Sequence, residues 1–206
     1  MFVGAKFLCI CYKLFWVSAF KTMSTCNTWI FRTKLFLNGV TCGKLVKSYG
    51  FSGPSVRISL NAGNVKIGDN VTFNNYNDAG WYAKCSLWVK EKATLKIGDN
   101  SGFNGVLIYS SKSVSIGDNV KVGGGSRIFD TDFHPLDYLT RRTSNEGTKT
   151  ADIVIGDDVF IGTNCIISKG VHIGARSIIA AGSVVVKSIP ADEVWGGNPA
   201  KFIRKL

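Results

Sequence analysis

His134 is the residue of this chain whose type and neighbours best suit acid–base chemistry. It lies in the run Asp130-Thr131-Asp132-Phe133-His134-Pro135-Leu136-Asp137. A positioned imidazole can take a proton from a weak nucleophile such as a hydroxyl near neutral pH, and flanking carboxylates are expected to raise its basicity and fix its tautomer. For an isolated loop histidine, a hydrogen bond to a carbonyl would be the better interpretation, so the general-base hypothesis depends on context. His172, the other histidine, sits in a regular stretch of sequence and is expected at the surface.

The cysteines and histidines do not suggest a metal site. Two histidines are too few for a zinc site of three histidines, which argues against a carbonic anhydrase. The six cysteines show neither CxxC pairs nor metal-ligand spacing. We therefore expect no metal, reduced thiols and a cytoplasmic protein. The cysteines are Cys9, Cys11, Cys26, Cys42, Cys85 and Cys165.

A six-residue repeat indicates the elements that must position His134. Aliphatic residues recur at perfect six-residue spacing at Ile155, Ile161, Ile167, Ile173, Ile179 and Val185. A second row runs through Val159, Cys165, Val171, Ser177 and Ser183. Repeats of this period indicate a parallel β-helix, in which each unit is a short strand plus a turn. An ordinary strand would alternate with period 2 instead.

The repeat extends upstream with interruptions. The motif Ile-Gly-Asp-Asn occurs at residues 67–70, 97–100 and 116–119. It predicts a tight turn, because Gly and Asn tolerate positive φ and Asp can bond backbone N–H groups locally. We place the coils from about residue 56 to about residue 189, broken by a polar insertion at residues 132–152. Such a long loop is usually functional or disordered, and His134 stands at its start.

Residues 1–55 form a basic, aromatic segment outside these coils. The net charge is +11, and no acidic residue precedes Asp69. Cations interleaved with Phe and Trp fit a membrane surface or nucleic acid, but no nucleic-acid motif is present. The uncharged runs are too short for a spanning helix, and Lys6 and Lys13 interrupt any signal peptide. Two interpretations stay open: an interfacial helix in contact with a membrane, or a cap on the solenoid.

Four stretches of the chain resemble the hexapeptide-repeat acyltransferases of the maltose, galactoside and polysaccharide O-acetyltransferase type. They are Asp132-Phe133-His134-Pro135, Ile161-Gly162-Thr163-Asn164, residues 181–187 and residues 196–204. The resemblance covers residues 56–206. It implies a left-handed parallel β-helix, a homotrimer with active sites between subunits, and acetyl-CoA as donor.

The resemblance also implies roles for individual residues. His134 matches the family's catalytic histidine, and the backbone at Thr163 and Ala181 would contact the pantetheine arm. Basic side chains suit the CoA phosphates, and residues 190–206 would form a CoA-binding tail. The implied donor-binding residues are Phe160, Gly162, Thr163, Ala181, Lys187, Lys201 and Arg204. The implied acceptor-binding residues are Asp132, Asn104, Tyr138, Arg141 and Arg142.

We therefore expect an O-acetyltransferase that uses acetyl-CoA and acts on a saccharide hydroxyl, in surface polysaccharide biosynthesis, by direct transfer with His134 as general base. Two alternatives remain. One is N-acetylation of an amino sugar nucleotide. The other is a non-catalytic solenoid that binds or scaffolds, although this chain lacks the flat threonine array of an ice-binding protein.

Overall fold

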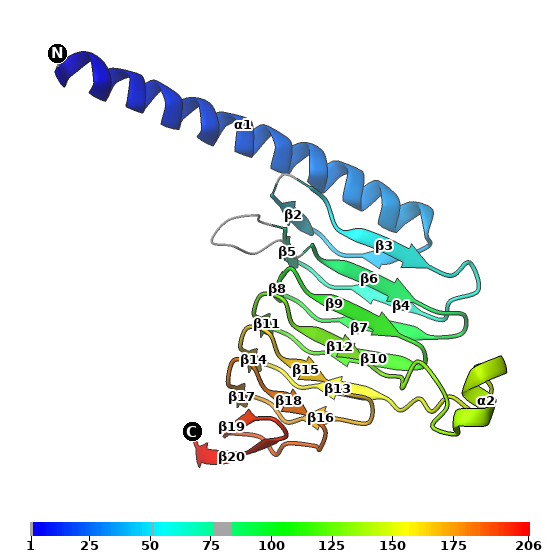
Figure 1. Cartoon of the computed structure of the whole chain (residues 1–206). Helices are drawn as coiled ribbons and strands as arrows, with labels where there is room; N and C mark the ends of the chain where they lie inside the picture. Colours follow the sequence, from blue (N-terminus) through cyan, green and yellow to red (C-terminus); the bar gives the residue numbers. More distant parts are fainter. Residues whose placement is uncertain (1, 51, 76–83) are drawn as a thin grey trace.

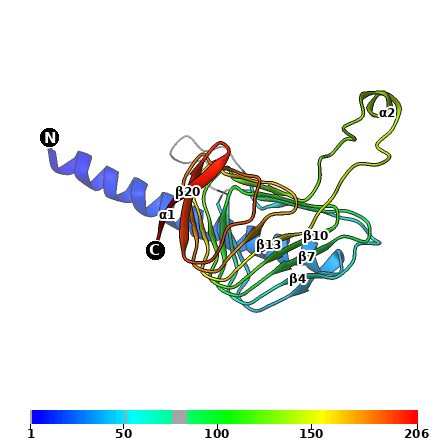
Figure 2. The ribbon, with the colours of Figure 1, turned by 90° about the horizontal axis from the view of Figure 1, so that it is seen from below.

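The computed structural model describes residues 2–50, 52–75 and 84–206, and the side chains of the first helix from residue 12 onward. Helix α1 (Phe2–Leu37) lies across one end of a stack of strands, and helix α2 (Tyr138–Thr143) lies in a loop at its side (Figure 1). The stack is a left-handed parallel β-helix, as predicted, with a triangular section seen along its axis in Figure 2.

Three sheets form the sides of the triangle. Sheet A contains β1 (Thr41–Cys42), β4 (Val65–Ile67), β7 (Thr94–Ile97), β10 (Ser113–Ile116), β13 (Ile153–Ile155) and β16 (His172–Ile173). Sheet B contains β2 (Lys47–Tyr49), β5 (Thr72–Asn74), β8 (Gly102–Asn104), β11 (Lys121–Val122), β14 (Phe160–Ile161), β17 (Ile178–Ile179), β19 (Glu193–Gly197) and β20 (Ala200–Lys205). Sheet C contains β3 (Ser55–Ile58), β6 (Ser86–Val89), β9 (Leu107–Ser110), β12 (Arg127–Phe129), β15 (Ile166–Ile167) and β18 (Val184–Val185).

The core is built from the predicted rows of residues. Every member of the first row, Ile155 to Val185, and of the second row, Val159 to Ser183, is at most 2% exposed. Residues one coil apart pair directly, such as Ile155 with Ile173 and Ile161 with Ile179. Each fully buried Ile or Val contributes roughly 1.5–3 kcal/mol of hydrophobic stabilisation, so the repeat itself holds the coils together.

The corner between sheets A and B (the A–B corner) explains the Ile-Gly-Asp-Asn motif. The asparagines have positive φ as predicted, with 56° at Asn100 and 58° at Asn119. The aspartates bond the neighbouring coil rather than their own turn: the N–H of Asp99 donates to Asp118 Oδ1 over 2.7 Å. Gly98 is required by close packing, because a Cβ there would lie 2.6 Å from the carbonyl carbon of Gly117.

The solenoid begins earlier than the expected residue 56. The first coil runs from β1 to β3, so residue 56 lies inside it. This coil lacks the Ile-Gly-Asp-Asn motif and could not be found from it. The C-terminal half of α1 covers the open end of this coil with Phe31 and Leu35, both buried.

Some expectations concern parts of the chain that the structure does not describe. The side chains of Cys9, Cys11 and Lys6 lie outside the described residues, whereas Cys26, Cys42, Cys85 and Cys165 are free thiols. In the described part of the chain, no helix combines the length and hydropathy needed to span a membrane.

Candidate active site

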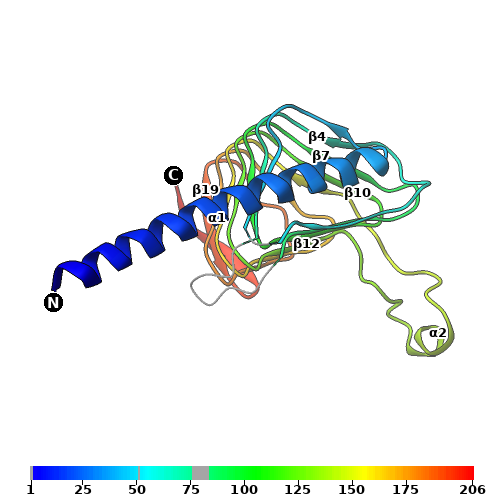
Figure 3. The ribbon, with the colours of Figure 1, turned by 90° about the horizontal axis from the view of Figure 1, so that it is seen from above.

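The loop that carries His134 leaves the solenoid at the corner between sheets C and A (the C–A corner), between β12 and β13. Its two ends are joined by backbone hydrogen bonds from Asp132 N–H to the Lys149 carbonyl and from Ala151 N–H to the Asp130 carbonyl, each 3.0 Å. Beyond this stem the loop with α2 extends away from the sheets, as Figures 2 and 3 both show.

Asp130 fixes the root of the loop. It is fully buried. Its carboxylate accepts the backbone N–H groups of Ser111, Lys112 and Ser113 at 2.6, 2.8 and 2.8 Å. Three charge-assisted bonds of this kind hold the chain rigidly on the body of the fold, four residues before His134.

His134 is exposed, and one of its two ring nitrogens is engaged. Nδ1 lies 2.8 Å from Asn145 Oδ1, across the loop. An amide oxygen only accepts hydrogen bonds, so this contact places the proton on Nδ1. In the neutral imidazole Nε2 then carries the lone pair, which is what a general base requires.

The expectation that flanking carboxylates orient His134 is wrong. Asp132 pairs with Lys169 at 3.1 Å, and Asp137 caps α2 by accepting the Thr140 N–H over 2.6 Å. This backbone hydrogen bond lowers the pKa of Asp137 below its usual range. Sequence reasoning missed Asn145, because an amide inside a polar loop carries no signal of its own.

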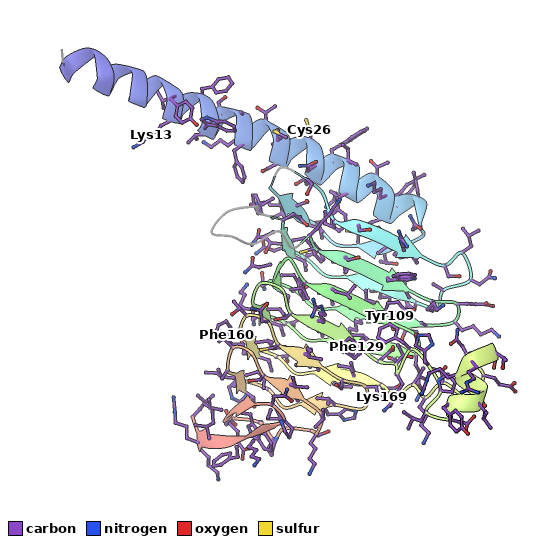
Figure 4. The ribbon with its side chains drawn as sticks, in the orientation of Figure 1. Lys13, Cys26, Tyr109, Phe129, Phe160 and Lys169 are labelled. Carbon is purple, nitrogen blue, oxygen red and sulfur yellow. The ribbon has the colours of Figure 1, made fainter. Side chains whose placement is uncertain are left out.

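An aromatic row runs along sheet C toward the loop. We use this name for Trp88, Tyr109, Phe129 and Phe133. The rings of Trp88 and Tyr109 lie 5.0 Å apart, and Phe133 lies 4.9 Å from Tyr109 and 5.3 Å from Phe129. Figure 4 shows Tyr109 and Phe129 on the side of the solenoid from which the loop leaves. Phe133 has a φ of 63°, which is costly for a bulky residue, and it directly precedes His134.

The other expected acceptor residues occupy different places. Arg141 Nη1 donates to the carbonyls of Pro135 and Leu136 at 3.0 and 3.1 Å, so it braces the turn after His134. Arg142 stacks over Tyr138 at 5.3 Å, both exposed on α2. Asn104 is remote from this group, since it ends β8 in sheet B.

Most of the expected donor residues meet elsewhere, at the corner between sheets B and C (the B–C corner). Gly182 N–H donates to the Thr163 carbonyl over 2.8 Å, which joins two successive coils there. A Cβ on Gly162 would lie 2.6 Å from Ala181 N, so the corner must stay small. In sheet B, Phe160 pairs with Ile178, which pairs with Val194, which in turn pairs with Arg204. Phe160 and Arg204 therefore lie in one row across the strands.

Lys187 is separated from the other donor residues. It follows β18 by two residues, as Lys169 follows β15, and so lies at the C–A corner. His134 also lies at that corner, whereas Phe160 lies at the opposite edge in Figure 4. One chain therefore does not bring the expected base and the B–C corner together. In the described residues, no group of three or more His, Cys, Asp or Glu side chains could hold a metal ion.

Comparisons with known proteins find the same repeat in acetyltransferases. The family model "Bacterial transferase hexapeptide (six repeats)" matches residues 152–187. The galactoside O-acetyltransferase of Escherichia coli is 34% identical over 129 residues, covering 59% of this chain and 62% of the relative. The chain thus spans less than two thirds of the length of that curated relative.

Two solved structures extend the similarity over most of the chain. A hexapeptide-repeat acetyltransferase of Vibrio cholerae, complexed with acetyl-CoA, is 26% identical with a TM-score of 0.57, covering 92% of this chain and 88% of the other. The polySia-specific acetyltransferase NeuO is 26% identical with a TM-score of 0.61, covering 81% and 75%.

Proposed function

We propose that this chain, a hexapeptide-repeat protein related to these acetyltransferases, transfers an acetyl group from acetyl-CoA to a saccharide hydroxyl. The observation that carries the proposal is the state of His134, which is exposed, braced through Asn145, and left with a free Nε2. Nε2 accepts the proton of the acceptor hydroxyl as its oxygen attacks the acetyl carbonyl carbon. The carbon–sulfur bond breaks, and the imidazolium returns the proton to the departing thiolate. General-base catalysis of this kind is worth roughly 10²–10⁴ in rate.

Acetyl-CoA supplies the acetyl group as an activated thioester. The B–C corner suits its pantetheine arm, because Ala181 is small and exposed there and Gly162 lets the two coils pack closely behind it. Phe160 is 49% exposed beside that corner, and Lys201 and Arg204 place positive charge on β20 for the phosphates. Lys187 lies at the C–A corner, so it would contact acetyl-CoA from the side on which His134 lies.

The working enzyme is then a homotrimer with sites between subunits. The separation of His134 from the B–C corner in one chain supports this, since a neighbouring copy would supply the missing half. A head-to-tail interface that closes as a ring repeats such a site once per subunit.

A saccharide acceptor is supported by the aromatic row next to His134. The apolar face of a sugar ring packs on aromatic side chains, and polar groups bind its hydroxyls. Asp132, Tyr138 and Arg142 border the same loop, and Arg141 positions it. Asn104 would join them only from another subunit, because it lies in sheet B.

We further propose that the protein acts in the cytoplasm, where its thiols stay reduced, on surface polysaccharide precursors. An acceptor panel tests the proposal by the release of free thiol from acetyl-CoA. We expect turnover with sugars that carry free hydroxyls and none with acceptors in which they are blocked. Turnover confined to amino sugar nucleotides would replace O-acetylation by N-acetylation, and no thiol release with any acceptor would contradict the proposal.

A further inference from the structure

Helix α1 has an inner face whose role is clear from its contacts. Phe31 packs on Phe73 of β5, in the second coil, with ring centroids 5.1 Å apart. Thr28 Oγ1 donates to the Ser48 carbonyl at 3.1 Å and accepts the Ser48 N–H at 2.9 Å, and Asn27 donates to the Gly50 carbonyl at 2.7 Å. These bonds cover the edge of β2, which would otherwise be open to pairing with another strand.

The opposite side of α1, which we call the outer face, consists of Phe15, Trp29 and Phe36. Trp29 and Phe36 each lie five residues after an inner-face residue, Ser24 and Phe31, or about 140° round the helix. Phe15 lies nine residues before Ser24, or about 180° away. These three side chains are 66%, 71% and 78% exposed. Figure 3 shows α1 lying over the end of the solenoid, with the side of the helix that is turned away from the strands toward the viewer.

Cations flank the outer face. Lys21 and Arg32 lie along one edge of it and Lys34 along the other, by the same helical geometry, and all three are exposed. A groove beside the helix, of about 440 Å³, adds Lys47 next to Lys21, with Phe20, Thr25 and Tyr49 also lining it. No acidic residue occurs in the chain before Asp69, whose carboxylate accepts the Lys44 N–H of the first coil, so basic side chains predominate at this end of the molecule.

We propose that the outer face of α1 docks on an anionic lipid bilayer. Aromatic side chains between flanking cations are the pattern of a helix that lies in the membrane interface, with the cations reaching the headgroups. A second copy of the chain is the weaker occupant, because pairing two outer faces would bring cation to cation. Nucleic acid is weaker too, since the sequence carries no nucleic-acid-binding motif.

This docking goes beyond the proposed enzyme activity and does not depend on it. The inner face of α1 packs on the solenoid, and its outer face would contact the membrane. The helix would therefore attach the solenoid to the membrane. Each cation near an anionic surface adds to the attraction, and salt screens that part of it. Binding should therefore weaken in high salt while the aromatic contribution persists.

Vesicle sedimentation of the full chain tests the proposal. The probes are vesicles of phosphatidylcholine with and without phosphatidylglycerol. We expect the protein to pellet with the anionic vesicles. The triple variant Phe15→Ser, Trp29→Ser, Phe36→Ser should partition at least about tenfold more weakly. The control Leu60→Ser, which alters a 97% exposed leucine outside α1, should bind like the wild type.

Two further measurements test whether unfolding or self-association explains a loss of vesicle binding. Thermal unfolding should show that the triple variant keeps its fold, because the three side chains are at least 66% exposed. Light scattering separates the membrane from a second copy. If full-length protein ignores anionic vesicles, or if the folded triple variant binds them as strongly as the wild type, the proposal is overturned. A smaller assembly in the variant together with no vesicle binding would assign the outer face to an interface between copies.

Discussion

The A–B corner and the C–A corner both carry aspartates, yet they use them differently. At the A–B corner, Asp69, Asp99 and Asp118 repeat from coil to coil, and each accepts a backbone N–H of the coil before it. At the C–A corner, Asp130 and Asp132 occur once, around the departure of the loop.

The difference distinguishes polar residues that have a structural role from polar residues that are available for catalysis. A polar residue that recurs at every coil is explained by the contact between coils. A polar residue that occurs once, where the repeat is interrupted, has no such explanation, and function concentrates at such loops. His134 is of the second kind, whereas His172 lies on β16 of a regular coil, where the repeat is not interrupted.

The replacement His134→Ala should give the largest effect at the C–A corner. Loss of the general base should lower kcat by at least about 10², without a change in melting temperature, because the side chain is exposed. The matched control His172→Ala should keep wild-type kcat. Steady-state kinetics of thiol release measure both, and near-normal turnover by His134→Ala would remove the residue from the mechanism.

At the A–B corner, Gly98→Ala should affect stability instead. The new Cβ would lie 2.6 Å from the Gly117 carbonyl carbon, and forced shifts of this kind cost about 1–3 kcal/mol. Gly53→Ala is the control, since its Cβ would meet only ordinary contacts at 3.7 Å and beyond. Thermal unfolding compares them. Equal melting temperatures would show that the glycines of the motif are not required by the packing of the coils.

Asn145→Ala should lower kcat by about tenfold, because His134 would lose the partner that sets its tautomer. Asn145→Asp keeps an oxygen acceptor and should restore most of the activity. The pH profile distinguishes this role from mere packing: the aspartate should raise the apparent pKa of the catalytic step. If the alanine and aspartate variants behave alike, the hydrogen bond to Nδ1 does not position the base.

The smallest effect concerns Asp137 and the helix α2. Its pKa is lowered by its bond to the Thr140 N–H, so the cap is fully present above the unfolded carboxyl value and is lost as pH falls through the folded value. Hydrogen exchange at the Thr140 amide should become less protected below about pH 4. Asp137→Ala should remove this pH dependence. The same acid dependence in the variant would exclude the cap as its cause.

The sequence predicts the regular part of the fold well, because the rows Ile155–Val185 and Val159–Ser183 depend on local periodicity alone. The first coil could not be predicted from the Ile-Gly-Asp-Asn motif, because it lacks that motif. The insertion at residues 132–152 and the position of His134 at its start were predicted, but Asn145 was not, since contacts across a loop leave no pattern. The two faces of α1 were also hidden, because apolar residues occur all round the helix.

Mixing two inactive variants tests the central claim, that the base of one subunit meets the donor corner of another. His134→Ala removes the base, and Ala181→Trp fills the B–C corner, where Ala181 is exposed. Each variant alone should be nearly inactive. Random mixed trimers should regain about a quarter of wild-type thiol release, because one pairing in four joins two intact halves across a head-to-tail interface. If confirmed mixed oligomers show no more than the summed residual activities of the two variants, the shared site is contradicted.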